Sequence, residues 1–196
     1  MSGRLPGLIS FLALFLAQAL LTQAGSRSLS GPVASMQRKL QHLEQNGLLR
    51  HPDPAPTAFA ENEVNAYMAS GAVKLPTGVR SVHFQGQSGI LKATTRVDFD
   101  QLRAGRSSAN PWLAVFTGTH DVDVVAHARG LGSEGLVHVD SVSLDGVETP
   151  RFVLQLFVEK YLQPRCPGVG LDSRFKLPAR IDTATIGSHV LTVTQK

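Results

Sequence analysis

THDVDVVAHARGLGSEGLVHVDSVSL, residues 119–144, is the stretch that decides the fold. Within 119–129 and again within 136–144, apolar residues alternate with polar ones, which is typical of strands with one buried face. The intervening segment 130–135 matches G-x-G-x-x-G, but a dinucleotide site needs that loop to lead from a strand into a helix. Because a second strand follows instead, we predict a long antiparallel hairpin with a glycine-rich loop.

Further patterns predict the elements on either side of this hairpin. A helix with a narrow apolar stripe is expected from 31 to 47, a short helix from about 60 to 70, and a short capped turn at 110–116. Two further hairpins are expected, one with strands 79–85 and 90–99, and one with strands 174–185 and 189–194. Together with the central hairpin they give an antiparallel sheet of about six strands.

The segment 150–163 predicts the main helix of the domain. Thr149-Pro150 form its cap, the run FVLQLFVEKYL (152–162) follows, and Pro164 ends it. This helix is apolar nearly all round, and such helices are normally enclosed. We therefore predict an α+β fold in which a curved antiparallel sheet of about six strands wraps around a long apolar helix.

The N-terminal residues predict export. Arg4 precedes the apolar run 8–21, and Thr22-Gln23-Ala24 places small residues where a signal peptidase cleaves. A run of this length is too short to span a bilayer comfortably. We expect residues 1–24 to be a signal peptide, 25–56 to be an N-terminal helix with a proline-rich linker, and 57–196 to form a single α+β domain.

Composition narrows the class of partner. Without residues 1–24 the chain carries 18 Lys and Arg against 15 Asp and Glu, too mild an excess for a nucleic-acid binder. The single cysteine, Cys166, allows no internal disulfide. The lack of disulfides and of N-x-[ST] glycosylation sites favours a bacterial periplasmic protein over other classes of secreted protein.

Polar residues on the central hairpin form the one cluster that could serve either as a metal site or as an ordinary solvated surface. The side chains of Asp121, Asp123, His127, His138 and Asp140 share a parity, so they can lie on one face of the sheet. They could hold a divalent ion, or they could simply solvate that face. The spacing fixes no ligand geometry, so we favour the solvated face and expect no metal, no cofactor and no enzymatic activity.

The apolar turn 112–116 has two interpretations. Its side chains either plug one end of the core, or line a ligand cavity or contact a membrane surface.

The layout resembles the half-domains of the tubular lipid-binding superfamily, which includes bactericidal/permeability-increasing protein. The resemblance rests on Phe59–Tyr67 (FAENEVNAY), on Val142–Val147 (VSLDGV) leading into Pro150, and on the order of helix and sheet, over about 57–194. It implies an apolar groove between sheet and helix that accepts acyl chains. Many members carry a lipid on an N-terminal cysteine, which this chain lacks.

We therefore expect a periplasmic or secreted protein that binds a lipid or other apolar molecule between the sheet and helix 150–163. The expected ligand-contacting residues are Val82, Phe84, Leu91, Trp112, Phe116, Val122, Val124, Phe152, Leu156 and Phe157. The main alternative is a non-enzymatic envelope protein with a filled core, which docks a partner through its sheet edge or the Trp112 patch. A membrane surface is a further candidate partner, and an enzyme that uses the hairpin carboxylates and histidines ranks third.

The export prediction has a direct test. Expression in a bacterial host with an active secretion pathway should give a mature chain that begins at Gly25, because the residues before it match a signal-peptidase site. The intact mass of the purified protein measures this. A membrane-bound species that keeps residues 1–24 would contradict cleavage and indicate an anchor.

Overall fold

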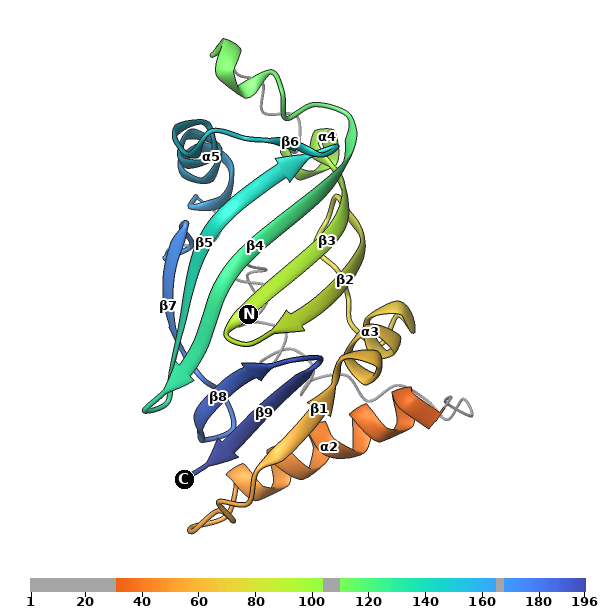
Figure 1. Cartoon of the computed structure of the whole chain (residues 1–196), viewed down its shortest axis with the longest axis vertical. Coiled ribbons are helices and arrows are strands. Elements are labelled where there is room, and N and C mark those ends of the chain that lie inside the picture. Colours follow the sequence, from red (N-terminus) through yellow and green to blue (C-terminus); the bar gives the residue numbers. More distant parts are fainter. Residues whose placement is uncertain (1–30, 104–109, 165–167) are drawn as a thin grey trace.

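The computed structural model describes residues 31–103, 110–164 and 168–196. The predicted signal peptide and Cys166 lie outside these residues. One antiparallel sheet of nine strands dominates the fold, with two helices at one end and shorter helical segments at the other (Figure 1).

The strand order along the main path of the sheet is β1-β9-β8-β4-β3-β2, and β5 pairs with the other edge of β4 and with β6 and β7. The bounds are β1 (Thr57–Ala60), β2 (Val79–Gln87), β3 (Ile90–Asp98), β4 (Thr119–Leu131), β5 (Glu134–Leu144), β6 (Val147–Glu148), β7 (Asp172–Lys176), β8 (Ile181–Gly187) and β9 (Val190–Gln195).

The predicted central hairpin is confirmed as β4 and β5, paired from Val122↔Leu144 to Leu131↔Glu134. Gly132 (φ 61°) and Ser133 (φ 64°) form its two-residue turn, where both central residues have positive φ. The opposite edge of β4 pairs first with β3 and then with β8. The hairpins β2–β3 and β8–β9 thus lie end to end along one strand.

The prediction of a sheet wrapped around a long apolar helix is wrong. Only α5 (Arg151–Phe157) and the π-helical turn η3 (Val158–Leu162) occupy the predicted segment. One face of α5 packs on the sheet through Val153 and Phe157, whereas Phe152 is 51% exposed. A helix that is apolar on all sides need not be enclosed by the sheet. Here the Phe152 ring packs on an exposed neighbour, Trp112, instead.

The predicted number of strands was also too low. The segment 174–185, expected as one strand, forms parts of β7 and β8, which pair with different partners. Pro178 has no backbone N–H for a ladder, and Ala179 and Arg180 have φ of 50° and 55°, which break the extended conformation. Strands β1 and β6 are only four and two residues long and were not predicted.

The helices expected at 31–47 and 60–70 are confirmed as α2 (Gly31–Gly47) and α3 (Glu61–Ala69). Helix α2, at 17 residues the longest in the part of the chain that the structure describes, buries the predicted stripe Val33, Met36, Leu40 and Leu43. Short helix α4 (Phe99–Arg103) and the 3₁₀ turn η2 (Pro111–Leu113) complete the helical segments. None of the helices in the described parts of the chain has the length and hydropathy that crossing a membrane requires.

A buried amide network fixes the C-terminal end of α2. The Asn46 side chain donates to Gln195 Oε1 (2.7 Å) and to the Asp53 carbonyl (2.9 Å), and accepts from Asp53 N (2.8 Å). Gln195 in turn donates to the Leu43 carbonyl at 2.7 Å. Because unmatched buried amides are costly, this network specifies how α2 and the proline-rich segment sit against β9.

The apolar side chains form two cores. The upper core lies among β3, β4, β5, α4, α5, η2 and η3, and includes Val97, Phe116, Val139, Phe157 and Tyr161. The lower core lies among α2, α3, β1, β2, β8 and β9, and includes Leu43, Phe59, Phe84, Ile181 and Val193. Leu91 and Leu191 pack against both cores, so the two meet along the sheet.

Helix α3 covers part of the free edge of β2 with polar side chains. The Asn65 side chain accepts from Phe84 N and donates to Phe84 O, both at 2.8 Å, as a neighbouring strand would. Glu61 Oε2 accepts from Gly86 N at 2.8 Å. Edge strands with unpaired backbone groups invite aggregation, and these side chains satisfy three such groups.

Asn65 therefore contributes to stability in a way that a nearby asparagine does not. We expect Asn65→Ala to lower the free energy of unfolding by about 1–3 kcal/mol, because it removes both partners of Phe84 from a partly buried site. Asn62→Ala, at an exposed position of the same helix, should change it by about 0.5 kcal/mol or less. Urea unfolding of both variants measures the difference, and equal losses would show that the edge contact contributes nothing.

Candidate functional site

A partly open apolar cavity of about 80 Å³ lies where the two cores meet, and we call it the seam cavity. Its lining comes from β4 and β5 on one side and from both flanking hairpins, with β1, α3 and the β7–β8 segment, on the other. The lining residues are Phe59, Glu61, Val64, Phe84, Gly86, Leu91, Ala128, Arg129, Gly130, Gly135, Leu136, Val137, Phe175, Leu177, Ala184, Ile186, Val190 and Leu191.

Small residues in register form part of the cavity lining. Gly130 pairs with Gly135 across β4 and β5, and Gly130 also pairs with Ala184 on β8. A Cβ at Gly135 would lie 2.2 Å from the Phe175 ring, and one at Gly130 would lie 2.7 Å from Leu177 Cδ1. The glycines of the G-x-G-x-x-G segment therefore let Phe175 and Leu177 pack closely over the sheet, in keeping with a hairpin and not a nucleotide loop.

Glu61 is the one acidic side chain in the lining. Its Oε2 accepts from Gly86 N at 2.8 Å and lies 3.0 Å from His189 Nδ1. Partial burial raises the pKa of Glu61, but the hydrogen bonds from Gly86 and His189 outweigh it, so the pKa lies below its ordinary value. Its negative charge is thus already satisfied by the protein.

Only two of the ten residues predicted to contact a ligand, Phe84 and Leu91, line the seam cavity. Val82 is partly buried against the lower core. Phe116, Val122 and Phe157 are buried in the upper core, and Val124 and Leu156 pack at its margin. Trp112 and Phe152 are exposed, by 58% and 51%. Within the predicted set, Phe116 therefore contacts Phe157 and Trp112 contacts Phe152. Val82 and Phe84 belong to the lower core.

Sequence reasoning missed most of the lining because it looked for large apolar side chains. The lining also includes Gly130, Gly135, Ala128 and Ala184. The two glycines let Phe175 and Leu177, which line the cavity too, approach the sheet closely. One signal was available: two glycines at strand positions on either side of a tight turn often mark a close approach of other groups. The approaching groups could not be identified from the local sequence, since Phe175 and Leu177 lie at least 40 residues further along the chain than either glycine.

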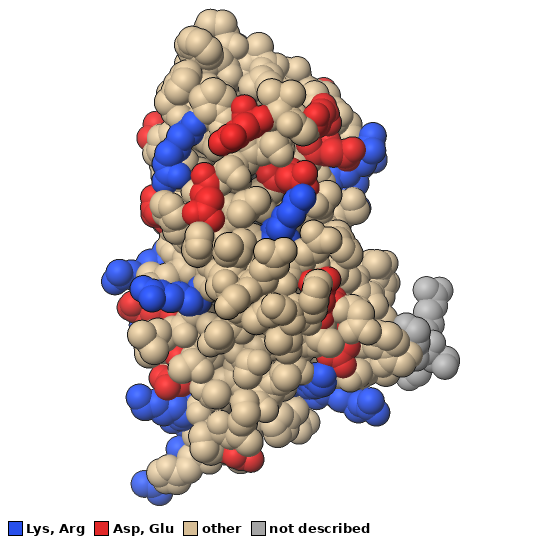
Figure 2. All heavy atoms as spheres, in the orientation of Figure 1, with Lys and Arg blue, Asp and Glu red and all other residues tan. Residues whose placement is uncertain are grey.

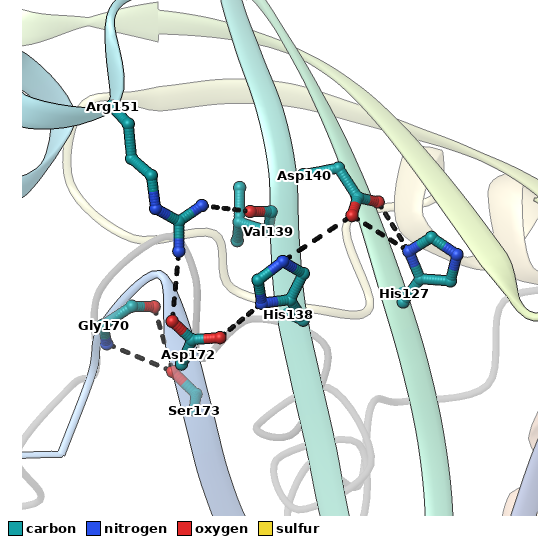
Figure 3. A network of polar contacts seen from close by, with 8 residues as sticks. All are labelled: His127, His138, Val139, Asp140, Arg151, Gly170, Asp172 and Ser173. Atoms are coloured by element: carbon teal, nitrogen blue, oxygen red, sulfur yellow. Dashed lines mark hydrogen bonds and ion pairs between the residues drawn. The ribbon is translucent and has the colours of Figure 1, made fainter.

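Three of the polar residues predicted on the central hairpin, His127, His138 and Asp140, are exposed and belong to one network of polar contacts (Figure 3). His127 Nδ1 lies 2.8 Å from Asp140, His138 hydrogen-bonds Asp172, and Arg151 reaches Asp172 at 3.1 Å. The hydrogen bond from His138, and then the charges of His138 and Arg151, lower the pKa of Asp172.

The remaining hairpin carboxylates pair with β3. Asp123 accepts from Thr94 at 2.6 Å, and Asp121 lies 3.4 Å from Arg96. Across the described residues, no group of three or more His, Cys, Asp or Glu is placed so that it could hold a metal ion. Exposed cross-strand pairs of this kind keep one face of the sheet hydrated and contribute little to the free energy of unfolding.

A second apolar surface lies at the upper end of the molecule, and we call it the aromatic tip: Trp112, Val115 and Phe152. The ring centroids of Trp112 and Phe152 are 5.1 Å apart with an edge-to-face angle of 81°. Asn110 caps the turn by accepting from Trp112 N at 3.0 Å. The structure divides the two interpretations of this segment: Leu113 and Phe116 are buried in the core, whereas Trp112 and Val115 are exposed.

The pair His120–Asp145 joins the base of this tip to the β5–β6 turn. His120 Nδ1 lies 2.5 Å from Asp145 Oδ2, and its Nε2 lies 2.7 Å from the Thr117 carbonyl. The hydrogen bond with Asp145 raises the pKa of His120 against partial burial, which lowers it. The same bond lowers the pKa of Asp145.

These shifts predict how stability depends on pH. A His with a raised pKa in the folded state contributes stability that is fully present below its ordinary pKa of about 6.5 and is lost as pH rises through the raised pKa. The lowered pKa of Asp145 acts in the opposite direction, so its contribution is lost as the solution becomes acidic. Asp145→Asn keeps an acceptor for Asp121 N and tolerates the φ of 49°.

We expect Asp145→Asn to be less stable than wild type at about pH 5.5 and to differ less from it at about pH 8.5. Urea unfolding at both pH values, with an NMR titration of His120, measures this. A His120 pKa that is the same in both proteins would contradict the assigned pair.

Comparison with protein-family models, curated proteins and solved structures finds no match to this chain. The resemblance to the tubular lipid-binding superfamily therefore stays a prediction. The inference about what the protein binds must therefore rest on the cavity and the surfaces of the protein itself.

Proposed function

We propose that the protein binds the alkyl part of a lipid or another slender apolar molecule in the seam cavity. One observation carries this proposal: a partly open cavity whose lining is apolar except for Glu61 and Arg129. The Glu61 charge is already engaged, so the lining offers a ligand hydrophobic contact and little directed polar recognition. This favours binding over catalysis.

The energetics support an occupant. Dry apolar cavities accept apolar guests, and each methylene moved from water into such a site contributes about 0.8 kcal/mol. An alkyl chain that enters the cavity would recover this free energy.

The size restricts the ligand. The cavity is smaller than the roughly 150 Å³ of an engineered cavity that admits benzene. It therefore suits the end of a flexible chain, with the remainder of the molecule extending through the open side. Residues 1–24 add the second part of the proposal, which is that this ligand is met outside the cytoplasm, in the periplasm or after secretion.

A series of straight-chain alcohols tests the binding site. From butanol to decanol, affinity should rise about fourfold per added methylene until the chain outgrows the cavity, because each group buries a similar area. The shift of the thermal midpoint with alcohol concentration measures affinity, since a ligand that binds only the folded state stabilises it. A shift independent of chain length would contradict an apolar site.

A matched pair of substitutions on β4 locates the site. Ala128 lines the cavity, whereas Ala126 faces the packed upper core, and both are 5% exposed. Ala128→Leu should fill the cavity, abolish the alcohol response and leave the midpoint nearly unchanged. Ala126→Leu should destabilise by about 1–3 kcal/mol through overpacking and keep the response. Large destabilisation by both, with no lipid retained by the wild type in native mass spectrometry, would favour a filled core and an interaction protein instead.

A further inference from the structure

The aromatic tip presents apolar side chains that the fold does not bury. Trp112, Val115 and Phe152 are exposed by 58%, 45% and 51%. Trp112 and Phe152 come from segments 40 residues apart and still meet edge to face at 5.1 Å. Two large aromatic side chains are thus held together at the surface, far from the lining of the seam cavity.

The tip is fixed on a rigid base. Leu113 and Phe116, from the same turn, are 3% and 2% exposed, and the Phe116 ring lies 4.3 Å from that of Phe157. Arg103 donates to the Phe116 carbonyl at 3.0 Å. Because Leu113 and Phe116, three residues apart, anchor the turn in the core, Trp112 and Val115 are presented in a set arrangement and do not need to be ordered by a partner.

Charge identifies the kind of surface that fits. Residues 110–119 contain no Lys, Arg, Asp or Glu, and the uppermost part of the face shown in Figure 2 is free of charged side chains. The upper end projects beyond the sheet in Figure 1, away from the C-terminus and α2. In the described helical segments that adjoin the tip, Arg103 of α4 is matched by Asp100, and Lys160 of η3 by Glu159.

We propose that the aromatic tip inserts into the interfacial region of a lipid bilayer that carries no net surface charge. An uncharged, projecting tip is complementary to such a surface, where Trp places its apolar ring among the acyl chains and its N–H among the polar groups. A protein partner would meet few polar groups here with which to set orientation. This inference is independent of the seam cavity.

Trp112 is the only tryptophan of the chain, so its fluorescence reports directly on the tip. Phosphatidylcholine vesicles should shift its emission to the blue, and phosphatidylcholine brominated in the upper acyl chain should quench it. Phe152→Ser and Val115→Ser keep the reporter and should each weaken partitioning, Phe152→Ser by about tenfold, because less apolar surface enters the bilayer. Circular dichroism checks that both variants remain folded.

Leu131→Ser is the matched control, because Leu131 is 65% exposed but is the last residue of β4, next to the β4–β5 turn and outside the tip. It should bind vesicles like wild type, as should Ala128→Leu. No blue shift with phosphatidylcholine would overturn the proposal and leave a protein partner as the occupant of the tip. Binding only to vesicles that contain phosphatidylglycerol, or equal weakening by Leu131→Ser, would also overturn it, since either result assigns attachment to another part of the surface.

Discussion

The two-sided pairing of β4 is the constraint on which the rest of this fold depends. One edge of this strand is matched along Val122 to Leu131 by β5, and the other is shared between β3 and β8. Along β4, each of the two flanking hairpins, β2–β3 and β8–β9, must therefore end where the other begins. Backbone bonds join the two ends, from Gly89 N to Ile186 O at 2.8 Å and from His189 N to Gly86 O at 2.9 Å. Two cores and a seam between them follow from this arrangement.

The seam explains why a hollow forms at this position. The upper core is built mainly on β3, β4 and β5, and the lower core mainly on α2, β1, β2, β8 and β9, so the cavity lies where two separately packed sets of side chains meet. The Gly130–Gly135 pair lies at this junction. Larger residues there would collide with Phe175 and Leu177. The two glycines therefore set how closely the β7–β8 segment, which forms part of the lining, approaches the sheet.

Local patterns predicted those parts of the fold that depend on local periodicity. Alternation gave the β4–β5 and β2–β3 hairpins, and the stripe of Val33, Met36 and Leu40 gave α2. The fate of segment 150–163 could not be predicted, because its composition does not say which neighbours it meets. The split at Pro178 could have been predicted, since proline cannot donate in a ladder. The cavity could not be predicted, because its lining brings Phe84 together with Ala128 and Ala184 through strand pairings that no local sequence pattern contains.

The segment FAENEVNAY (59–67), which carried part of the family resemblance, has a structural role that can be stated without it. Glu63 accepts from Ala60 N at 2.9 Å, which is one half of a capping box, and pairs with Lys39 of α2 at 2.6 Å. Asn65 covers the edge of β2, and Glu61 covers Gly86 beside the cavity. Alternate polar residues of one short helix therefore start the helix, hold α2, protect the sheet edge and close the rim of the seam cavity. A ligand that enters past this rim must leave the Glu61–Gly86 bond intact or replace it, since a buried unpaired amide costs more than one weak apolar contact returns. Entry by the end of an alkyl chain, which demands no polar partner, is the route that leaves these bonds in place.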